Sequence, residues 1–353
     1  MHVNYLWANL WACGQKRGQQ LALLIERYPT RGSIVSQNCE SIAPLFIRQA
    51  TLEDAELVLE ILNSEVNGVD PDEGNYGIDI AKNIIQSPGD PSATWLFSEN
   101  EQAVPFGVGN LHPDLSAKNL EPIIAVRFGD TRYGVLLDWF ILEAQKEYPD
   151  FRIQIVVSQK HSQNLEHASS RGFLPIRFYN TLRAPVAPNL EPPALPEGVV
   201  IRNADLNNMS DLRKVHSTLQ NSFSENFGFV PRDFDPWVKR FKADKSVPSD
   251  GVYLLEYLGS AVGFIWLDDI DALELRGFVD RLGVNKEHHG KGFGQLLLGT
   301  ALAHFSRRGY VHAVLGVDTQ NASNALRVYE KMGFVAISTG VEHERLVTIA
   351  SGL

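Results

Sequence analysis

Hydrophobic positions near the end of the chain form a regular succession of apolar runs and helical repeats. FVDRLGV, residues 278–284, predicts a buried strand. Apolar residues within QLLLGTALAHFSRRG, 295–309, recur at helical spacing, and this helix is expected to stop at Gly309, after two arginines. YVHAVLGV, 310–317, predicts a further strand. In NASNALRVYEKMGF, 321–334, four apolar side chains share one face of a last helix.

An earlier part of the chain repeats this organisation. Residues 46–62, FIRQATLEDAELVLEIL, and residues 200–216, VIRNADLNNMSDLRKVH, each predict a strand ending in Ile-Arg, an acidic turn and an amphipathic helix. Arg171-Gly172-Phe173 closes the first copy and Met332-Gly333-Phe334 the second. The offset between the copies changes only from 154 to 161 residues along their length. Duplication of one architecture is therefore the simplest account.

A proline-rich segment separates the two copies. APVAPNLEPPALPEG, residues 184–198, contains five prolines, which favour an extended, semi-rigid spacer. We therefore expect an N-terminal domain over 45–183 and a C-terminal domain over 199–353. Residues 1–44 show no sustained period and are predicted to be a disordered leader.

Composition and charge exclude several classes of function. The formal charge of -10 disfavours nucleic acid as a partner, because binding to the phosphate backbone needs a basic face. No apolar run approaches the roughly 18 residues of a membrane span. The N-terminal charge order is the reverse of a secretory signal, so a cytoplasmic protein is expected. The only cysteines are Cys13 and Cys39, and the adjacent His288 and His289 lack a third ligand, so no metal is expected.

A glycine-rich loop, HHGKGFG at 288–294, joins the predicted strand to the helix after it. Such a loop at a helix N-terminus offers unpaired backbone N–H groups to an anion, which predicts a phosphate cradle. It is not a P-loop, because Gly292 follows Gly290-Lys291 where Ser or Thr is required. It is also a poor dinucleotide fingerprint, because the third glycine would fall at Gln295.

Two motifs in this region resemble the GNAT superfamily of acyl-CoA-dependent N-acetyltransferases. The first comprises Val284, His289, Gly292 and Gly294, with His289 where Arg or Gln is usual. The second comprises Asn321, Ala325, Tyr329, Glu330, Lys331, Gly333 and Phe334. The tandem layout resembles that of double-GNAT proteins of the mycothiol synthase type. The resemblance implies a mixed α/β fold, in which each domain has a mostly antiparallel sheet with splayed fourth and fifth strands flanked by helices.

The resemblance also implies acetyl-CoA as cosubstrate. In the family, the pyrophosphate lies on backbone amides of this loop, here His289, Gly290, Lys291, Gly292, Phe293, Gly294 and Gln295. The pantetheine arm pairs with the fourth strand, here Leu282, Gly283 and Val284. Asn321 would contact the cofactor or cap the next helix, and both roles are compatible.

The family's catalytic tyrosine, which protonates the departing thiolate, matches Tyr329. Many members place a basic Glu on the fourth strand, but the aligned residue here is Phe278. Asp280 lies two residues on, on the same face of a regular strand, and is the nearest substitute. Glu274 is further out, and a structural or water-mediated role for Asp280 remains open.

The segment 222–237 aligns with the helices that cover the family's acceptor site. Phe223, Phe227 and Trp237 would wall that site, with Glu225 as a polar handle, although ordinary packing explains the aromatic residues equally well. The acceptor class is a small-molecule or peptide amine.

The first copy does not keep this chemistry. Arg132 stands opposite Gly292, Lys160 opposite Asn321, and Ala168 opposite Tyr329. We therefore predict a catalytically silent N-terminal domain and an active C-terminal one.

The sequence thus predicts an N-acetyltransferase that acts on a primary amine and exists as a monomer or weak homodimer. It is expected to bind neither nucleic acid nor membrane. The alternative is a non-catalytic protein that binds or senses acyl-CoA.

Overall fold

The chain forms two compact units, each described by itself: residues 1–178 with 338–353, called unit 1, and residues 179–337, called unit 2. The computed structural model describes residues 33–34, 45–86, 93–111, 113–115, 117–243, 247–269, 274–320 and 325–347. Apart from β1 (Ser33–Ile34), which pairs with the next strand, the predicted leader lies outside these residues.

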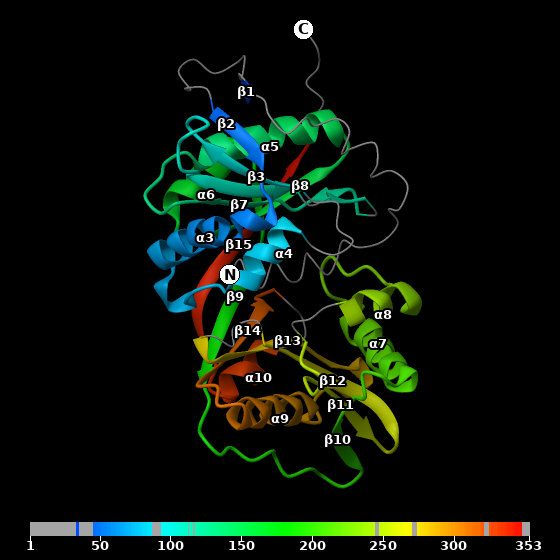
Figure 1. Cartoon of the computed structure of the whole chain (residues 1–353). Helices are drawn as coiled ribbons and strands as arrows, with labels where there is room; N and C mark the ends of the chain where they lie inside the picture. Colours follow the sequence, from blue (N-terminus) through cyan, green and yellow to red (C-terminus); the bar gives the residue numbers. More distant parts are fainter. Residues whose placement is uncertain are drawn as a thin grey trace. The chain divides into compact units, whose positions relative to one another are not determined.

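Within the described residues, unit 1 is built from two groups of strands and four helices (Figure 1). One sheet has the order β1-β2-β3-β4-β7: β2 (Leu45–Gln49), β3 (Ala93–Ser98), β4 (Gly107–Leu111) and β7 (Ile123–Val126). The other group comprises β5 (Pro113–Asp114), β6 (Asn119–Leu120), β8 (Arg152–Ser158) and the end of β15 (Val335–Leu346). The helices are α3 (Ala55–Val69), α4 (Ile78–Ile85), α5 (Tyr133–Glu147) and α6 (Ser162–Ser170), with 3-10 turns η1 (Leu52–Asp54) and η2 (Pro71–Glu73).

Unit 2 has one mixed sheet. Its strands follow the order β10 (Val199–Asn203), β11 (Val252–Tyr257), β12 (Ser260–Asp268), β13 (Arg276–Val284), β14 (His312–Asp318) and β9 (Leu174–Pro185). Its helices are α7 (Met209–Phe223), α8 (Phe234–Ala243), α9 (Phe293–Arg307) and α10 (Ala325–Lys331), with a 3-10 turn η4 (Lys286–His288). The predicted elements at 278–284, 295–309 and 310–317 are confirmed as β13, α9 and β14, and the described part of 321–334 forms α10. Residues 321–324 lie outside the described residues.

Glycines let helices approach both faces of β13 closely. A Cβ at Gly277 would meet the Phe305 ring of α9 at 2.1 Å, and one at Gly283 would meet Ser222 Oγ of α7 at 2.2 Å. These glycines are six residues apart, so regular alternation would place them on the same face. An extra residue in β13, described below, reverses the alternation, and α7 and α9 therefore cover opposite faces (Figure 1).

The ends of the two units differ from the predicted domain boundaries. Tyr179–Pro185 of β9 pairs with β14 in unit 2, whereas Gly340–Leu346 of β15 pairs with β8 in unit 1. Each copy of the repeat thus gives the end of its last strand to the other unit, because an open sheet edge there accepts its backbone hydrogen bonds.

The proline-rich segment packs on unit 2 instead of spanning between domains. The Ser306 hydroxyl of α9 donates to the Ala187 carbonyl at 2.8 Å and accepts from the Leu190 amide at 3.0 Å. Pro193 lies against the backbone of α9 at Gly299, 3.2 Å from a Cβ placed there. The segment contains a turn at Asn189, whose φ of 57° is left-handed, and it belongs to unit 2.

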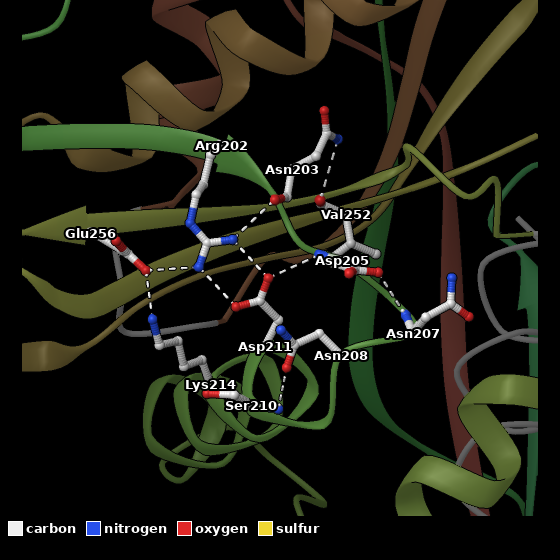
Figure 2. A network of polar contacts seen from close by, with 10 residues as sticks. All are labelled: Arg202, Asn203, Asp205, Asn207, Asn208, Ser210, Asp211, Lys214, Val252 and Glu256. Atoms are coloured by element: carbon white, nitrogen blue, oxygen red, sulfur yellow. Dashed lines mark hydrogen bonds and ion pairs between the residues drawn. The ribbon is translucent and has the colours of Figure 1, made fainter.

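The repeated Ile-Arg pair holds the first strand of each copy to the segment that follows it. Arg48 bonds both carboxylate oxygens of Asp54 at 2.6 and 2.8 Å, and Arg202 bonds both of Asp211 at 2.7 and 2.8 Å. Figure 2 shows that Arg202 also reaches Glu256, at 3.0 Å. The hydrogen bonds from Arg202 lower the pKa of Asp211 to about 2. An Arg–Asp pair of the same kind is therefore a structural feature of both copies of the repeat.

We predict that Asp211→Asn lowers the free energy of unfolding by about 1–3 kcal/mol at pH 7, because it breaks a largely buried charge-assisted pair. The pKa of Asp211 lies below its ordinary 3.8 in the folded state, so its stabilisation is complete above about pH 4 and is lost as the pH falls towards 2. Urea denaturation at pH 7 and pH 3 measures both effects. Glu191→Gln, an exposed change in the same unit, is the control, and equal losses in the two variants would contradict the prediction.

Candidate functional site

The fourth and fifth strands of unit 2 part after a short paired stretch. β13 and β14 pair in parallel only from Arg276–Val279 with His312–Leu315. Beyond this point, residues 281–284 pair with β12 alone, and β14 pairs with β9. Within the described residues, the edge of β13 that faces the opening therefore carries backbone groups without a partner strand.

A β-bulge lies where the two strands part. Trp266 of β12 is opposite Arg281, and the adjacent Leu267 is opposite Val279, so Asp280 is the extra residue. A bulge bends its strand and leaves the extra residue outside the regular ladder. No local sequence pattern indicates this bulge, because neither glycine nor proline marks it.

The loop after β13 has a backbone that only glycine adopts readily. Gly290 and Gly292 have φ values of 77° and 80°, in the left-handed region. Gly292 is the N-cap of α9 and has no side chain to cap it. His289 fastens the start of the loop, since its Nε2 hydrogen-bonds the Val284 carbonyl at 2.8 Å. The loop thus turns sharply from the end of β13 into α9.

Consecutive backbone amides of this loop point away from protein acceptors. The amides of His288 and His289 donate to the backbone carbonyls of Asn285 and Lys286. Those of Gln295 and Leu296 donate to the carbonyl of Gly292. No acceptor among the described residues takes the amides of residues 290–294. Together with the positive end of the α9 dipole, they form a site for an anion.

Open space lies beside this loop at Gly290, where a Cβ would meet no atom within 4 Å. A Cβ at Gly294 would meet nothing closer than Leu282 Cδ2 of β13 and Val328 Cγ1 of α10, each at 3.9 Å. Three elements therefore converge around this point without filling it. Lys291 adds positive charge at the rim, where its Nζ lies 5.0 Å from the Tyr257 ring centre and 3.3 Å from His288 Nδ1.

Tyr329 follows Val328 on α10 and is 8% exposed. Burial raises the pKa of its hydroxyl to about 12, so the group is protonated at neutral pH. Its ring packs against Phe334, with 6.1 Å between ring centres. Among the described residues, no hydrogen bond engages the hydroxyl, which leaves the group able to donate to a ligand.

Asp280, the bulged residue, is engaged by its neighbour. Its carboxylate lies 3.2 Å from Arg281 Nε, and its side chain is 13% exposed. The Arg281 guanidinium in turn lies over the Trp266 ring, 6.0 Å from its centre. Phe278, in the position where the family commonly has a base, is buried in the sheet.

The residues expected around the acceptor differ in their surroundings. Glu225 pairs with Lys286 of the glycine loop at 2.5 Å, and Phe227 is exposed. Trp237, by contrast, is 2% exposed and stacks on Phe241, so it can support the wall of a site only from behind. Asn321 lies outside the described residues.

The corresponding loop of unit 1 is filled by its own side chains. Arg132 is the N-cap of α5, as Gly292 is of α9. The Asp130 carboxylate accepts from the Arg132 amide at 2.9 Å and also binds its guanidinium. A Cβ at Gly134 would lie 2.8 Å from both Arg171 Nη2 and His167 Nδ1. A protein carboxylate and two basic side chains thus occupy space that is open in unit 2.

The described residues hold neither a metal-binding group of side chains nor a membrane-spanning helix. Within them, no group of three His, Cys, Asp or Glu side chains is arranged to hold a metal ion. None of the described helices is long and apolar enough to cross a membrane.

Residues 215–334 match the model of the acetyltransferase (GNAT) family. Among solved structures, a GCN5-related N-acetyltransferase from Sphaerobacter thermophilus aligns over 88% of this chain and 98% of its own, with 17% identity and a TM-score of 0.70. A tandem GNAT protein from the clavulanic acid biosynthesis pathway aligns over 86% of this chain and 98% of its own, with 15% identity and a TM-score of 0.66. A search of curated protein sequences gave no significant match. The predicted tandem GNAT fold is confirmed, whereas the likeness to mycothiol synthase stays a prediction.

The contrast between the two loops predicts opposite effects of one substitution. Gly294→Ala should change the free energy of unfolding by less than about 1 kcal/mol, on the stabilising side, because the new methyl group enters open space in a helix. Gly134→Ala should destabilise by about 1–3 kcal/mol, because Arg171 and His167 must move. Urea denaturation without ligand compares the pair. A larger loss in Gly294→Ala than in Gly134→Ala would show that the space at Gly294 is filled.

Proposed function

We propose that the C-terminal half of this chain is a GNAT enzyme, which transfers an acyl group from acyl-CoA, acetyl-CoA first of all, to a primary amine. The observation that carries the proposal is the row of amides at 290–294 without a protein acceptor, beside open space at Gly290 and the parted strands. In this proposal the reaction takes place in unit 2 alone.

The residues present fit the shape and charge of coenzyme A. Its diphosphate would accept hydrogen bonds from the loop amides between His289 and Gln295, because they offer donors without a protein acceptor. Lys291 would balance part of the negative charge. The pantetheine arm carries amide groups, and these can pair with the unpaired edge of β13 at Leu282–Val284 as an added strand. Asn321 would contact the same ligand.

The proposed reaction is a direct transfer. The neutral amine attacks the thioester carbonyl, a C–N bond forms and the C–S bond breaks. Tyr329 donates its proton to the departing thiolate, and its raised pKa keeps that proton on the hydroxyl at neutral pH. The proton lost by the amine goes to Asp280, directly or through water. Backbone N–H groups at the Asp280 bulge lie outside the regular ladder and would stabilise the oxyanion.

The acceptor side is proposed to lie under α7 and the segment after it. Phe227 is an exposed apolar surface there, and Glu225 offers a carboxylate next to the glycine loop. Trp237 would act through packing. These groups suit an amine with a small apolar part, of small-molecule or peptide origin.

A second function, non-catalytic binding of acyl-CoA, is favoured by one observation. The usual position of the base holds buried Phe278, and Asp280 is already paired with Arg281. Thermal stabilisation by acetyl-CoA with no thiol release from any amine of a broad panel would support this alternative over transfer.

Tyr329→Phe tests the chemical step. We expect kcat to fall about 10²- to 10⁴-fold with little change in KM for acetyl-CoA, because a positioned acid is lost while the ring remains. Release of coenzyme A, followed with a thiol reagent and an amine panel, measures it.

Tyr310→Phe is the matched control. The Tyr310 hydroxyl donates a hydrogen bond of 2.7 Å to Asp269, and Tyr310 follows the C-terminal end of α9, at the opposite end of that helix from the glycine loop. The variant should keep wild-type activity. Equal kcat values for Tyr329→Phe and the wild type would remove Tyr329 from the mechanism.

Gly294→Val tests the diphosphate cradle. The branched side chain should weaken coenzyme A binding about 100-fold or more, because it fills the space in front of the amides and leaves the fold intact. Isothermal titration calorimetry with coenzyme A measures the loss. Pantetheine, which lacks the diphosphate, should bind the wild type far more weakly than coenzyme A does. Unchanged affinity of Gly294→Val would overturn the proposed position of the cofactor.

A further inference from the structure

Unit 1 has its own opening between parted strands. β7 pairs with β4, and β8 pairs with β6 and β15, so no described pairing joins β7 to β8. A narrow, partly open cleft lies there, and the volume of about 430 Å³ within it includes open solvent. Its apolar walls come from α3, β7 and β8: Val66, Val69, Ile124, Val156 and Val157.

Polar groups at this cleft are deeply buried. Asn164, on α6, is 2% exposed, and its Oδ1 has no hydrogen-bond partner among the described residues. Its Nδ2 donates to Glu65 Oε1 of α3 at 3.3 Å. The hydroxyl of Tyr133, the first residue of α5, likewise makes no hydrogen bond to the described residues. A buried acceptor without a partner is costly, so a donor that enters the cleft would be stabilised there.

Most of the titratable groups around the cleft are carboxyl groups. Glu65, Asp70 and Glu73 line it, and Asp70 is paired with Lys160 at 2.5 Å. Burial raises the pKa of Glu65 to about 8 and lowers that of His161, which makes His161 neutral at pH 7. Burial and the nearby Glu65 both raise the pKa of Tyr133. A positive ligand next to Glu65 would oppose the cost of its ionisation.

The route to this cleft that a diphosphate would need is closed. The Asp130 carboxylate accepts the hydrogen bond of the Arg132 amide, and the side chains of Arg171 and His167 fill the space next to Gly134. Arg171 is fixed there by two bonds of 2.7 Å to Asp138. A ligand of the unit 1 cleft would therefore be smaller than, and different from, the proposed cofactor of unit 2.

We propose that the cleft of unit 1 is a binding site for a short alkyl primary ammonium ion. The three N–H groups of the ammonium donate to the Glu65 carboxylate, Asn164 Oδ1 and the Tyr133 hydroxyl. The alkyl tail lies against the valines and Ile124. This site is separate from the acyl-transfer site and does not depend on turnover there.

The test is isothermal titration calorimetry of the full chain with n-propylammonium chloride at pH 8. A ligand of this size is expected to bind with a Kd of about 0.1–10 mM. Glu65→Gln should weaken binding about tenfold or more, because it removes the charge but keeps the shape and the bond to Asn164. Tyr133→Phe should weaken it by several-fold. n-Propanol, which has no charge, should not bind.

Two controls separate this site from the rest of the protein. Glu56→Gln removes an exposed carboxylate from the same helix, α3, and should bind as the wild type does. Gly294→Val, which blocks unit 2, should also bind n-propylammonium normally. If Gly294→Val lost binding while Glu65→Gln kept it, the ammonium would be assigned to unit 2 and the proposal would be overturned. Absence of binding to the wild-type protein would also overturn it.

The pH dependence gives an independent readout. Because the ammonium binds ionised Glu65, affinity should rise about tenfold per pH unit from pH 6 to near pH 8 and then level off. The other titratable groups that line the cleft are Asp70, Glu73, Tyr133 and His161. In Glu65→Gln this rise should disappear. The same rise in Glu65→Gln would show that another of these groups controls binding and would contradict the role of Glu65.

Discussion

Backbone amides that have no protein acceptor are the constraint on which this structure depends. A folded chain normally satisfies such donors, and leaving them unpaired is unfavourable unless a ligand or water takes them. Here the parting of β13 from β14 and the turns at Gly290 and Gly292 leave a row of donors beside open space. The bulge at Asp280 and the close approach of α7 and α9 support this arrangement. The acyl-transfer proposal follows from what those donors can bind.

The two units show how one scaffold can keep or lose such a site. Both begin with an Arg–Asp pair, and both have a helix that starts after a parted strand. In unit 2 the helix N-terminus faces space, whereas in unit 1 Asp130 and Arg171 fill the equivalent position. A carboxylate supplied by the chain replaces the anion that a ligand would supply. The opening of unit 1 is left with acidic and apolar walls, which suit a small cation.

The ends of the repeats make the copies depend on each other for completion. Each last strand finishes in the sheet of the other unit, so neither copy has all its strands as a continuous segment. The proline-rich segment then returns along α9 to begin β10. The first copy thus contributes to the fold of unit 2, because unit 2 takes the end of β9 from it.

The sequence alone determined the repeat, the strand and helix order of unit 2 and the loop at 288–294, because periodicity, glycine and helix-end signals are local. It also named Tyr329 as a candidate, since that residue lies within a contiguous motif, and its role stays a prediction. Only the tertiary structure decided that Asp280 is the bulged residue beside Arg281, that Trp237 is buried, and that the last strands change units. Register, burial and strand partners depend on residues far apart in the chain, and local patterns carry no information about them.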